Sequence, residues 1–567
     1  MVDGGKSLLA GQSFAAIESF NKVLNLPSNK YTQDAQLWIA IAKERSGQQE
    51  KAILEFNAFL KLYPNGRSAT WVQARLDRLK QSQPAITVLA KSTFVPVKVK
   101  NTEFQYSEFG SLSTYYYQGS SQTDSVQTVG AKQTSNSLSR TDQQSLMANL
   151  NMTARAFNNE YDNRLVFQDY YSANFLPGQK SSQRLGAAFY EMRDRIVNYS
   201  VKIGRQSGFG GGVMGRFDGI SAGYGFAQEW KVNVVTGQLS DDWNKSKPNF
   251  NGVSLDFGTR SRMGGSVYFI NQTVSGFTDR RAVGGNLRYF DQRFNVMSTL
   301  DYDVLFKALN MITVQGALMG SETGTDFNFM LDRRRSPMLD IRNAVNGTST
   351  TFDAMVAAGS SAGDLIMYAK QRTAISNMAQ VGMTNHLNEK WNIGTDFTIT
   401  NTSGLPRSGG NTNLSCDASN AGFIPMEGCV DPTPASGNTW TISERMTGMG
   451  VIQPRDITNF NLNYTKSQQS TSVAFQVSNH VDLREKWTLD TTFRLSTQSS
   501  TPDSKSNDLS PTVRASYKLR NNMTLDGQFG LDWNRYSSTI TDSSNTTSSY
   551  TAKAFRKYYS FGGRYDF

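Results

Sequence analysis

The sequence predicts an all-β transmembrane barrel of about 22 antiparallel strands, joined to a small α-helical N-terminal region. Three observations lead to this prediction. Segments in which apolar and polar residues alternate recur from Phe104 to the end of the chain. No apolar run reaches the length of about 18 residues that a membrane helix needs. The chain ends on a strand with aromatic residues at alternate positions. Barrel strands face lipid on one side and the lumen on the other, so they are only half hydrophobic.

The first part of the chain has a helical repeat. The segment after Gly11-Gln12 matches the segment after Gly47-Gln48, which gives a period of 36 residues. The matched pairs are Ala16 with Ala52, Ile17 with Ile53, Phe20 with Phe56, Asn21 with Asn57, Leu24 with Leu60, and Leu26 with Leu62. With Trp38, Ala42 and Pro64, this pattern resembles a tetratricopeptide repeat. We expect a capping helix around Ala69–Leu79.

The resemblance implies that the helical region binds a peptide or protein, as short arrays of this kind do. The alternative is a structural cap for the barrel mouth, or the stump of a longer array. The expected partner-binding residues on these helices are Trp38, Phe56 and Trp71. The expected boundaries are 1–82 for the helical region, 83–102 for a linker and 103–567 for the barrel.

Alternation is clearest in three segments, Leu146–Ala156, Trp391–Thr400 and Val513–Leu519. A soluble sandwich would also alternate. The number of such segments, their length of about ten residues and the absence of interspersed helices favour a membrane barrel. The expected lumen-facing residues, which also suit cross-strand ion pairs, are Asp396, Asp490, Arg494, Arg514, Lys518, Asp526 and Asp532.

Connections between the strands fall into two classes. Short turns are expected within Asn385–Trp391 and Asn479–Trp487, each placing a tryptophan in an aromatic girdle. Similar turns are expected at Gln228–Trp230 and Leu519–Met523. The longer polar loops are expected at Gly119–Arg140, Asp241–Asn249, Ser336–Gly363, Ser403–Asn438 and Thr541–Ser549. Short turns at one end and long loops at the other are typical of membrane barrels.

Charge and cysteine content bound the compartment and the partners. The formal net charge is +11, but the charges are scattered, which favours a basic lumen or lipopolysaccharide-facing loops over nucleic acid. The chain has two cysteines, Cys416 and Cys429, in one polar loop. They suggest a local disulfide and an oxidising compartment, with two free thiols as the alternative.

Signals for enzymatic chemistry are weak. The two histidines, His386 and His480, lie beside expected turns without a partner pattern. No metalloprotease, phosphate-loop or serine-hydrolase motif occurs, and the glycine-rich Gly208–Gly212 is interpreted as a flexible hairpin loop. We therefore expect no enzyme, cofactor or metal, with an outer-membrane lipase or protease as the alternative.

The segment Asp332–Ala374 suggests a constriction. Three consecutive arginines close a strand, and Met338–Val345 and Phe352–Lys370 have helical character. Such an insert could fold into the lumen and filter anions and polar solutes. The alternative is an external loop packed on the rim. The candidate constriction residues are Arg333, Arg335, Arg342 and Lys370, opposed by Asp340 and Asp364.

The C-terminal strand resembles the terminal signature of bacterial outer-membrane proteins through Tyr559, Phe561, Tyr565 and Phe567. The resemblance implies a barrel in the outer membrane with its helical region in the periplasm. It also implies contact with the barrel assembly machinery, with membrane lipid and with lipopolysaccharide. No signal peptide is visible at Met1, so we expect a processed form or a fragment.

The combination of helical repeats and a C-terminal barrel resembles the export subunits of exopolysaccharide systems. The resemblance implies a channel that exports a polymer or protein, with the helical region docking a periplasmic partner. Two alternatives remain. One is a passive porin for small polar solutes. The other is an outer-membrane anchor for a surface filament or coat, which the long loop Ser403–Asn438 would suit.

Overall fold

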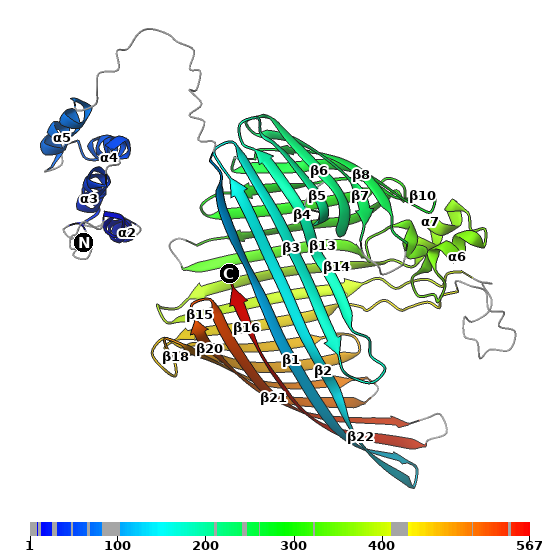
Figure 1. Ribbon diagram of the computed structural model, residues 1–567. Helices are drawn as coiled ribbons and strands as arrows, with labels where there is room; N and C mark the ends of the chain where they lie inside the picture. Colours follow the sequence, from blue (N-terminus) through cyan, green and yellow to red (C-terminus); the bar gives the residue numbers. More distant parts are fainter. Residues whose placement is uncertain are drawn as a thin grey trace. The chain divides into compact units, whose positions relative to one another are not determined.

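The computed structural model divides the chain into two compact units, Met1–Val99 and Lys100–Phe567 (Figure 1). It describes residues 8, 13–24, 31–46, 49–64, 68–81, 103–208, 212–240, 246–259, 261–320, 324–409, 429–501, 503–541 and 546–567. The expected linker 83–102 lies outside these residues, and so does Cys416, so the pairing of Cys416 with Cys429 stays a prediction. Among the described residues, no helix has the length and apolar character to cross a membrane.

The N-terminal unit is helical. Its helices are α2 (Ser13–Leu24), α3 (Thr32–Arg45), α4 (Gln49–Leu62) and α5 (Ala69–Gln81). Each helix packs against the next one in the sequence. Ala16, Ala40 and Ala52 are fully buried, and such small side chains let neighbouring helices approach closely. The helices and the capping helix were therefore predicted correctly, whereas membership of the repeat family stays a prediction.

The three expected partner-binding residues have different environments. Phe56 is fully buried in the helical core, so its expected role at the surface is wrong. Trp38 and Trp71 keep 39% and 45% of their surface exposed. Trp38 stacks on Phe20 with ring centroids 6.5 Å apart, and the Arg75 guanidinium lies 5.3 Å from the Trp71 ring centroid. Phe56 lies one repeat period after Phe20, and both side chains recur in the pattern because they are buried between helices.

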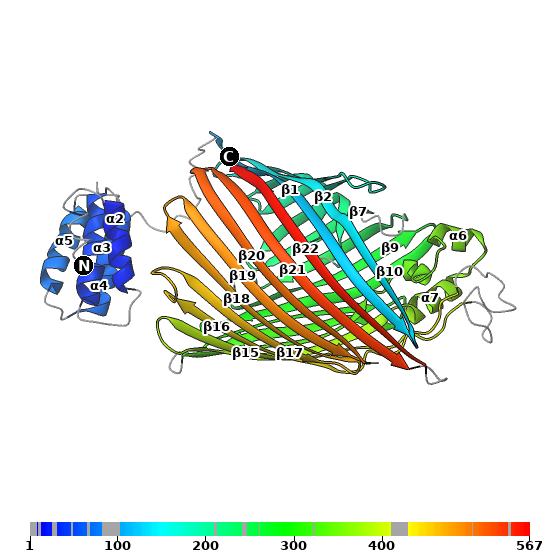
Figure 2. The ribbon, with the colours of Figure 1, turned by 90° about the horizontal axis from the view of Figure 1, so that it is seen from below.

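The second unit is a closed antiparallel barrel of 22 strands, which confirms the predicted fold class (Figure 2). Consecutive strands pair along the whole unit, and β1 pairs with β22. The strands are β1 (Gln105–Val129), β2 (Lys132–Phe157), β3 (Tyr161–Asn174), β4 (Ser182–Asp194), β5 (Tyr199–Ser207), β6 (Arg216–Ala227), β7 (Trp230–Leu239), β8 (Asn249–Phe257), β9 (Met263–Val274), β10 (Phe277–Phe290), β11 (Phe294–Asp303), β12 (Ala308–Leu318), β13 (Thr325–Ser336), β14 (Ala374–His386), β15 (Trp391–Thr402), β16 (Thr439–Met449), β17 (Ile457–Lys466), β18 (Ser470–Arg484), β19 (Trp487–Ser500), β20 (Ser504–Arg520), β21 (Met523–Thr541) and β22 (Thr547–Asp566).

The terminal strand closes the barrel. β22 pairs with β1 from Ser111↔Asp566 to Val129↔Ser548. The last residue extends this ladder, because the amides of Gly110 and Phe567 donate to each other's carbonyls at 2.9 and 3.1 Å. The aromatic residues of the expected signature share one outer face, with exposed fractions of 41% for Tyr559, 60% for Phe561, 45% for Tyr565 and 41% for Phe567.

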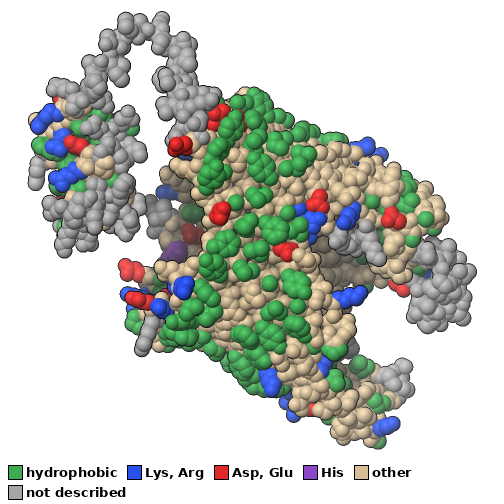
Figure 3. All heavy atoms as spheres, viewed as in Figure 1, with side chains coloured by type: hydrophobic (Ala, Val, Ile, Leu, Met, Phe, Trp, Pro, Cys, Tyr) green, Lys and Arg blue, Asp and Glu red, His purple; other side chains and the backbone are tan. Residues whose placement is uncertain are grey.

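The period of two gives the barrel an apolar outer face and a polar inner face. On β21, Leu525, Phe529 and Trp533 are exposed on the outside, whereas Asp526 between them turns inward. Figure 3 shows hydrophobic side chains spread over the visible face of the strands, with few charges among them. This arrangement suits an apolar solvent around the barrel and a hydrated interior.

The two ends of the barrel differ in their connections. At the end of the barrel where β1 begins and β22 ends, the turns contain two to seven residues. The turns expected within Asn385–Trp391 and Asn479–Trp487 lie there, with Trp391 and Trp487 opening their strands. Trp391 stacks on Phe460 at 6.4 Å and Trp487 contacts Tyr517 at 4.7 Å.

The opposite end carries the long connections 337–373 and 403–438. The loop expected at Gly119–Arg140 is wrong, because β1 and β2 continue through it to a two-residue turn at Gly130 and Ala131. Gly130 has φ +58°, which favours glycine. The expected loop at Thr541–Ser549 is also shorter, since only 542–546 separate β21 from β22. Polar residues here continue the strands beyond the apolar band.

Candidate functional site

The connection between β5 and β6 lies against the inner wall. Its residue Val213 is 5% exposed and packs in a cluster of inward-facing side chains. The strand residues of this cluster are Phe217, Val235, Leu239, Phe250, Ile270 and Ala282. Phe217 and Phe250 meet edge to face with ring centroids 5.0 Å apart. An apolar cluster inside a polar lumen thus holds the connection to the strands β6 to β10.

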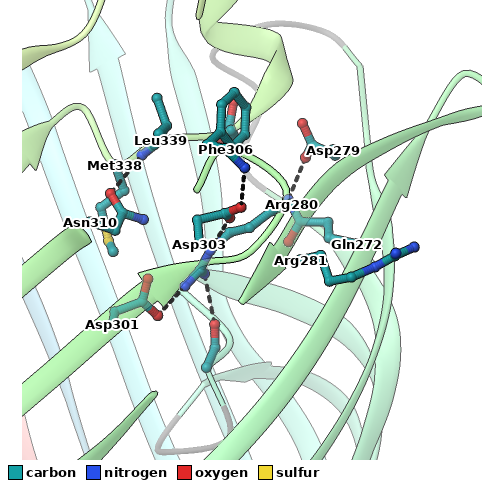
Figure 4. A network of polar contacts seen from close by, with 12 residues as sticks. Gln272, Asp279, Arg280, Arg281, Asp301, Asp303, Phe306, Asn310, Met338 and Leu339 are labelled. Atoms are coloured by element: carbon teal, nitrogen blue, oxygen red, sulfur yellow. Dashed lines mark hydrogen bonds and ion pairs between the residues drawn. The ribbon is translucent and has the colours of Figure 1, made fainter. Parts of the chain in front are cut away.

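Gly212 fits this connection for two reasons. Its φ is +77°, and a Cβ added there would lie 2.4 Å from the ring of Tyr268. Any side chain would therefore push the connection off the wall. Arg280 of β10 holds the same point, because its Nη1 donates to the Gly212 carbonyl at 2.9 Å. Figure 4 shows Arg280 together with Asp301 and Asp303. Gly212, the last residue of the glycine-rich run interpreted as a flexible hairpin loop, is anchored here, whereas residues 209–211 of that run lie outside the described residues.

The anchor belongs to a buried network of charges. Arg280 is 4% exposed and forms an ion pair with Asp301, while its Nε lies 3.8 Å from Asp303. Both carboxylates are fully buried, and Asp301 also accepts from the Tyr268 hydroxyl. Asp303 accepts from the Phe306 amide at 3.0 Å. Removing one partner from such a network leaves a buried charge, which costs several kcal/mol.

The insert between β13 and β14 forms a cap on the rim opposite the termini. It contains η1 (Ile341–Val345), α6 (Phe352–Ala357) and α7 (Ala362–Gln371), so its predicted helical character is correct. Phe352 and Leu365 are fully buried in a core that includes Val274 at the end of β9 and Phe306 of the β11–β12 connection. The Leu339 amide donates to Asn310 at 2.9 Å, and Ser275 donates to Asp353 at 2.6 Å.

A second buried group of charges fixes this insert. Arg342 lies 3.1 Å from Asp279 and 2.7 Å from Asp340. Gln272 donates to the same Asp279 carboxylate. Asp279 directly precedes Arg280 in the chain, so the two groups of buried charges adjoin each other. Burial, reinforced by the charge of Asp279, raises the pKa of Asp340 above its ordinary value. The Arg342–Asp279 ion pair thus holds the cap to β10, and Asp340 contacts the same arginine from within the cap.

The predicted constriction residues do not form an eyelet. Arg342 and Asp340 are brought together, but they pair with each other in the cap. Strand parity places Arg333 and Arg335 on the outer face with the exposed Leu331. The exposed Asp364 carboxylate accepts from the Ser361 amide and hydroxyl in the capping box of α7. Lys370 is exposed in the last turn of the same helix. The insert is packed on the rim of the barrel, which was the alternative to a constriction inside the lumen.

A cavity of about 270 Å³ lies on the inner wall beside the β5–β6 connection. Its charged lining comes from β4, β5, β7 and β8, with the cations Arg193, Lys202 and Lys231 and the carboxylates Glu191 and Asp256. Arg193 pairs with Glu191 at 2.7 Å, and Asp256 accepts from Asn233 at 2.8 Å.

The two lysines of this cavity make no ion pair with the described part of the chain. The Lys202 ammonium lies 4.7 Å from the ring centroid of Phe189, and Lys231 reaches the Ser200 hydroxyl at 3.4 Å. Both ammonium groups line the lumen cavity outside ion-pair distance of its two carboxylates, Glu191 and Asp256. Sequence reasoning missed them, although their alternation with the outward Ile203 and Val234 could have placed them.

Many charges on the rest of the inner wall pair with one another, whereas the predicted lumen residues Arg494 and Lys518 form no ion pair among the described residues. Among the predicted lumen residues, Asp396 pairs with Arg445 at 2.8 Å and Arg514 with Asp526 at 3.0 Å. The other ion pairs on this wall are Asp490–His480, Asp532–Arg556 and Asp142–Arg556. Within the described ranges, no group of acids, histidines and cysteines could hold a metal ion.

Comparison with known proteins shows limited similarity. No protein-family model and no curated protein matches the chain. Among solved structures, the chain is similar to Pseudomonas aeruginosa OccK2 (OpdF) at 9% identity and a TM-score of 0.32, covering 80% of this chain and 98% of that chain. The Pseudomonas aeruginosa outer membrane protein opdK has 9% identity and a TM-score of 0.32, covering 80% of this chain and 99% of that chain. Acinetobacter baumannii OccAB2 has 6% identity and a TM-score of 0.32, covering 80% of this chain and 98% of that chain. At these values the fold assignment depends on this chain's own strand pairing.

Replacing Arg280 with leucine is expected to release the β5–β6 connection. Asp301 would be left buried without its partner, at a cost of about 3–5 kcal/mol. Hydrogen exchange of residues 212–217 in the full chain should accelerate. The matched control is Arg281→Leu, since Arg281 is exposed and bonds only the Asn271 side chain. Equal protection in both variants would contradict the anchor.

The docking of the insert is expected to weaken as pH rises. The folded pKa of Asp340 lies above its unfolded value of about 4. The protonated carboxyl therefore favours the folded state at low pH, and this contribution is lost as pH rises through the folded pKa. The protection factors of residues 338–345, which correct for the base-catalysed intrinsic rate of exchange, should be higher near pH 5 than near pH 8. Asp340→Asn should remove this difference, and an unchanged profile would refute the assignment.

Proposed function

We propose that the protein is an outer-membrane channel for the passive diffusion of small polar solutes, with a preference for anions. This is the alternative that the sequence analysis left open beside polymer export. The observation that carries it is the cavity where Lys202 and Lys231 face the lumen without an ion pair. Cations on the wall of a narrow aqueous passage attract anions and repel cations.

The β5–β6 connection supports a narrowed passage on this side of the barrel. It covers the inner wall where Val213 packs among apolar side chains, and Arg280 fixes it. A rigid connection keeps its distance from the lysines constant, which a filter for small solutes requires. A barrel of this strand number is otherwise wide enough for a water-filled channel.

Placement in the outer membrane is supported by the barrel's own surface. The outer face is apolar, aromatic residues lie at strand ends, and the short turns share one end with both strand termini. In this placement the short turns face the periplasm and the cap on the rim faces outward. The helical unit then belongs to the periplasmic side.

We propose no enzymatic activity. For the helical unit we keep the proposal of a periplasmic protein partner, with Trp38 and Trp71 as its exposed aromatic residues. For export of a polymer, and for anchoring of a surface filament or coat, the support among the described residues is the joining of a helical unit to a barrel. Assembly of such a barrel requires the barrel assembly machinery of the outer membrane.

Anion preference is expected to depend on the two lysines. In planar bilayers, Lys202→Gln/Lys231→Gln should lower the chloride-to-sodium permeability ratio by about two- to tenfold, because the local anion concentration falls. The control is Arg205→Gln, which removes a charge from the outer face of β5. A chain that conducts nothing, or an unchanged ratio in the double variant, would refute the proposed function.

Membrane embedding of the outer face is expected to make a charge costly on the aromatic side of β22. Phe561→Arg should destabilise the barrel in lipid vesicles by about 2–4 kcal/mol in urea unfolding. Ser560→Arg, one residue away on the inner face, should cost much less because water solvates it. Similar losses for both variants would argue against lipid on the aromatic side.

A further inference from the structure

The outer wall carries a groove of about 670 Å³ near the closure of the barrel. It runs across β18 to β22 and reaches β1. Its apolar residues lie in one row across the strands, namely Phe475, Leu495, Leu509, Trp533 and Phe555. Their register is direct, since Phe475 faces Leu495, Leu495 faces Leu509, and Trp533 faces Phe555. The groove therefore offers an apolar floor the width of several strands.

Two cations lie directly beside this floor, one step nearer the rim opposite the termini. Arg535 follows Trp533 on β21, Lys553 precedes Phe555 on β22, and the two cations face each other in the ladder. Like charges directly opposite one another destabilise a sheet. In the part of the chain that the structure describes, neither side chain has an ion-pair partner. Such a pair is stabilised when an anion lies between the two cations.

The surrounding charges leave an excess of cations. Asp124 of β1 faces Lys553 from the other side and accepts from the Ser137 hydroxyl at 2.6 Å. On β20, Asn507 faces Arg535, and the exposed Lys505 is the next outward-facing residue toward the rim. Lys557 is exposed on β22, one outward position on the other side of Phe555. Four cations and the Asp124 carboxylate thus surround the edge of the groove on the outer face, because Asp508 turns to the inner face and accepts from Ser496 and Asn534.

A second groove on the outer wall shows that this combination is not general. It measures about 770 Å³ and lies across β8 to β12. Its lining is apolar or uncharged, with Val267, Val283, Leu287, Leu300 and Ile312. Acyl chains could lie in either groove, but only the first places cations at the edge of its apolar floor.

We propose that the groove beside Arg535 and Lys553 binds a phosphorylated glycolipid of the outer leaflet, of the lipid A class. The two cations would hold its phosphate, and an acyl chain would lie on Trp533 and Phe555. The inference rests on the proposed placement in an outer membrane, which puts this rim at the outer leaflet. A phosphate with acyl chains matches both the charge and the apolar floor.

The test is lipid binding to the full chain in detergent, measured by native mass spectrometry with hexa-acyl diphosphoryl lipid A. Arg535→Gln/Lys553→Gln should weaken binding by about tenfold or more, since two charge-assisted contacts are lost. The matched control is Lys390→Gln/Lys486→Gln, which removes two lysines from turns at the opposite end. The control should bind like the unaltered chain.

The lipid probes distinguish sources of the same chemistry. Chemically dephosphorylated lipid A should bind the unaltered chain as weakly as the double variant binds the phosphorylated lipid. Phosphatidylglycerol should bind less tightly than lipid A, and equal or tighter binding would overturn the choice of a glycolipid. Equal lipid A binding by the double variant and the control would overturn the site itself.

Stability gives an independent readout that misfolding could not imitate. Without lipid, Arg535→Gln/Lys553→Gln should unfold at the same or a higher temperature, because like charges no longer oppose each other. Added lipid A should raise the unfolding temperature of the unaltered chain more than that of the double variant. Conductance and anion preference should be unchanged in this variant, so failure of the lipid site and failure of the proposed channel are distinguishable.

Discussion

The hydrogen-bonded ladder between β1 and β22 is the constraint on which the rest of the barrel depends. An open sheet of this size would leave the backbone groups of two edge strands unpaired, which hydrocarbon does not tolerate. The ladder runs over almost the whole of β22 and continues through the Gly110–Phe567 pair. Once the sheet is closed, alternation alone decides which side chains meet the surroundings and which face the lumen.

Inside the barrel, charge has two different uses. Over much of the wall, cations and carboxylates on neighbouring strands pair and fix the register, as Arg514 and Asp526 do. In the buried network, Arg280 instead holds a backbone carbonyl and two carboxylates away from water. Lys202 and Lys231 differ from both groups because no carboxylate of the described chain lies within ion-pair distance of them, although Glu191 and Asp256 line the same cavity. Together with Arg193, they give this region of the polar interior an excess of cations that can act on a solute.

Local patterns predicted much of the fold. Alternation, the aromatic ending and the tryptophan-bearing turns are short-range signals, so the closed barrel and its short turns could be predicted. The candidate site could not, because Arg342 and Asp279 are distant in sequence and meet only after the insert folds onto the rim. Parity within β13 could have excluded Arg333 from the lumen, since it shares a face with Leu331. The Gly212 contact with Tyr268 left no local signal beyond a glycine-rich run.

The strands beside the closure are much longer than several strands further round the barrel. β1 and β2 contain 25 and 26 residues, whereas β5 and β8 contain nine each. At about 3.3 Å per residue, the hairpin of β1 and β2 exceeds the shortest strands by roughly 50 Å of chain length. The wall is therefore tall on one side and low on the other. Molecules arriving from outside meet a screen on the tall side, and their open approach lies over the low wall that carries the β5–β6 connection.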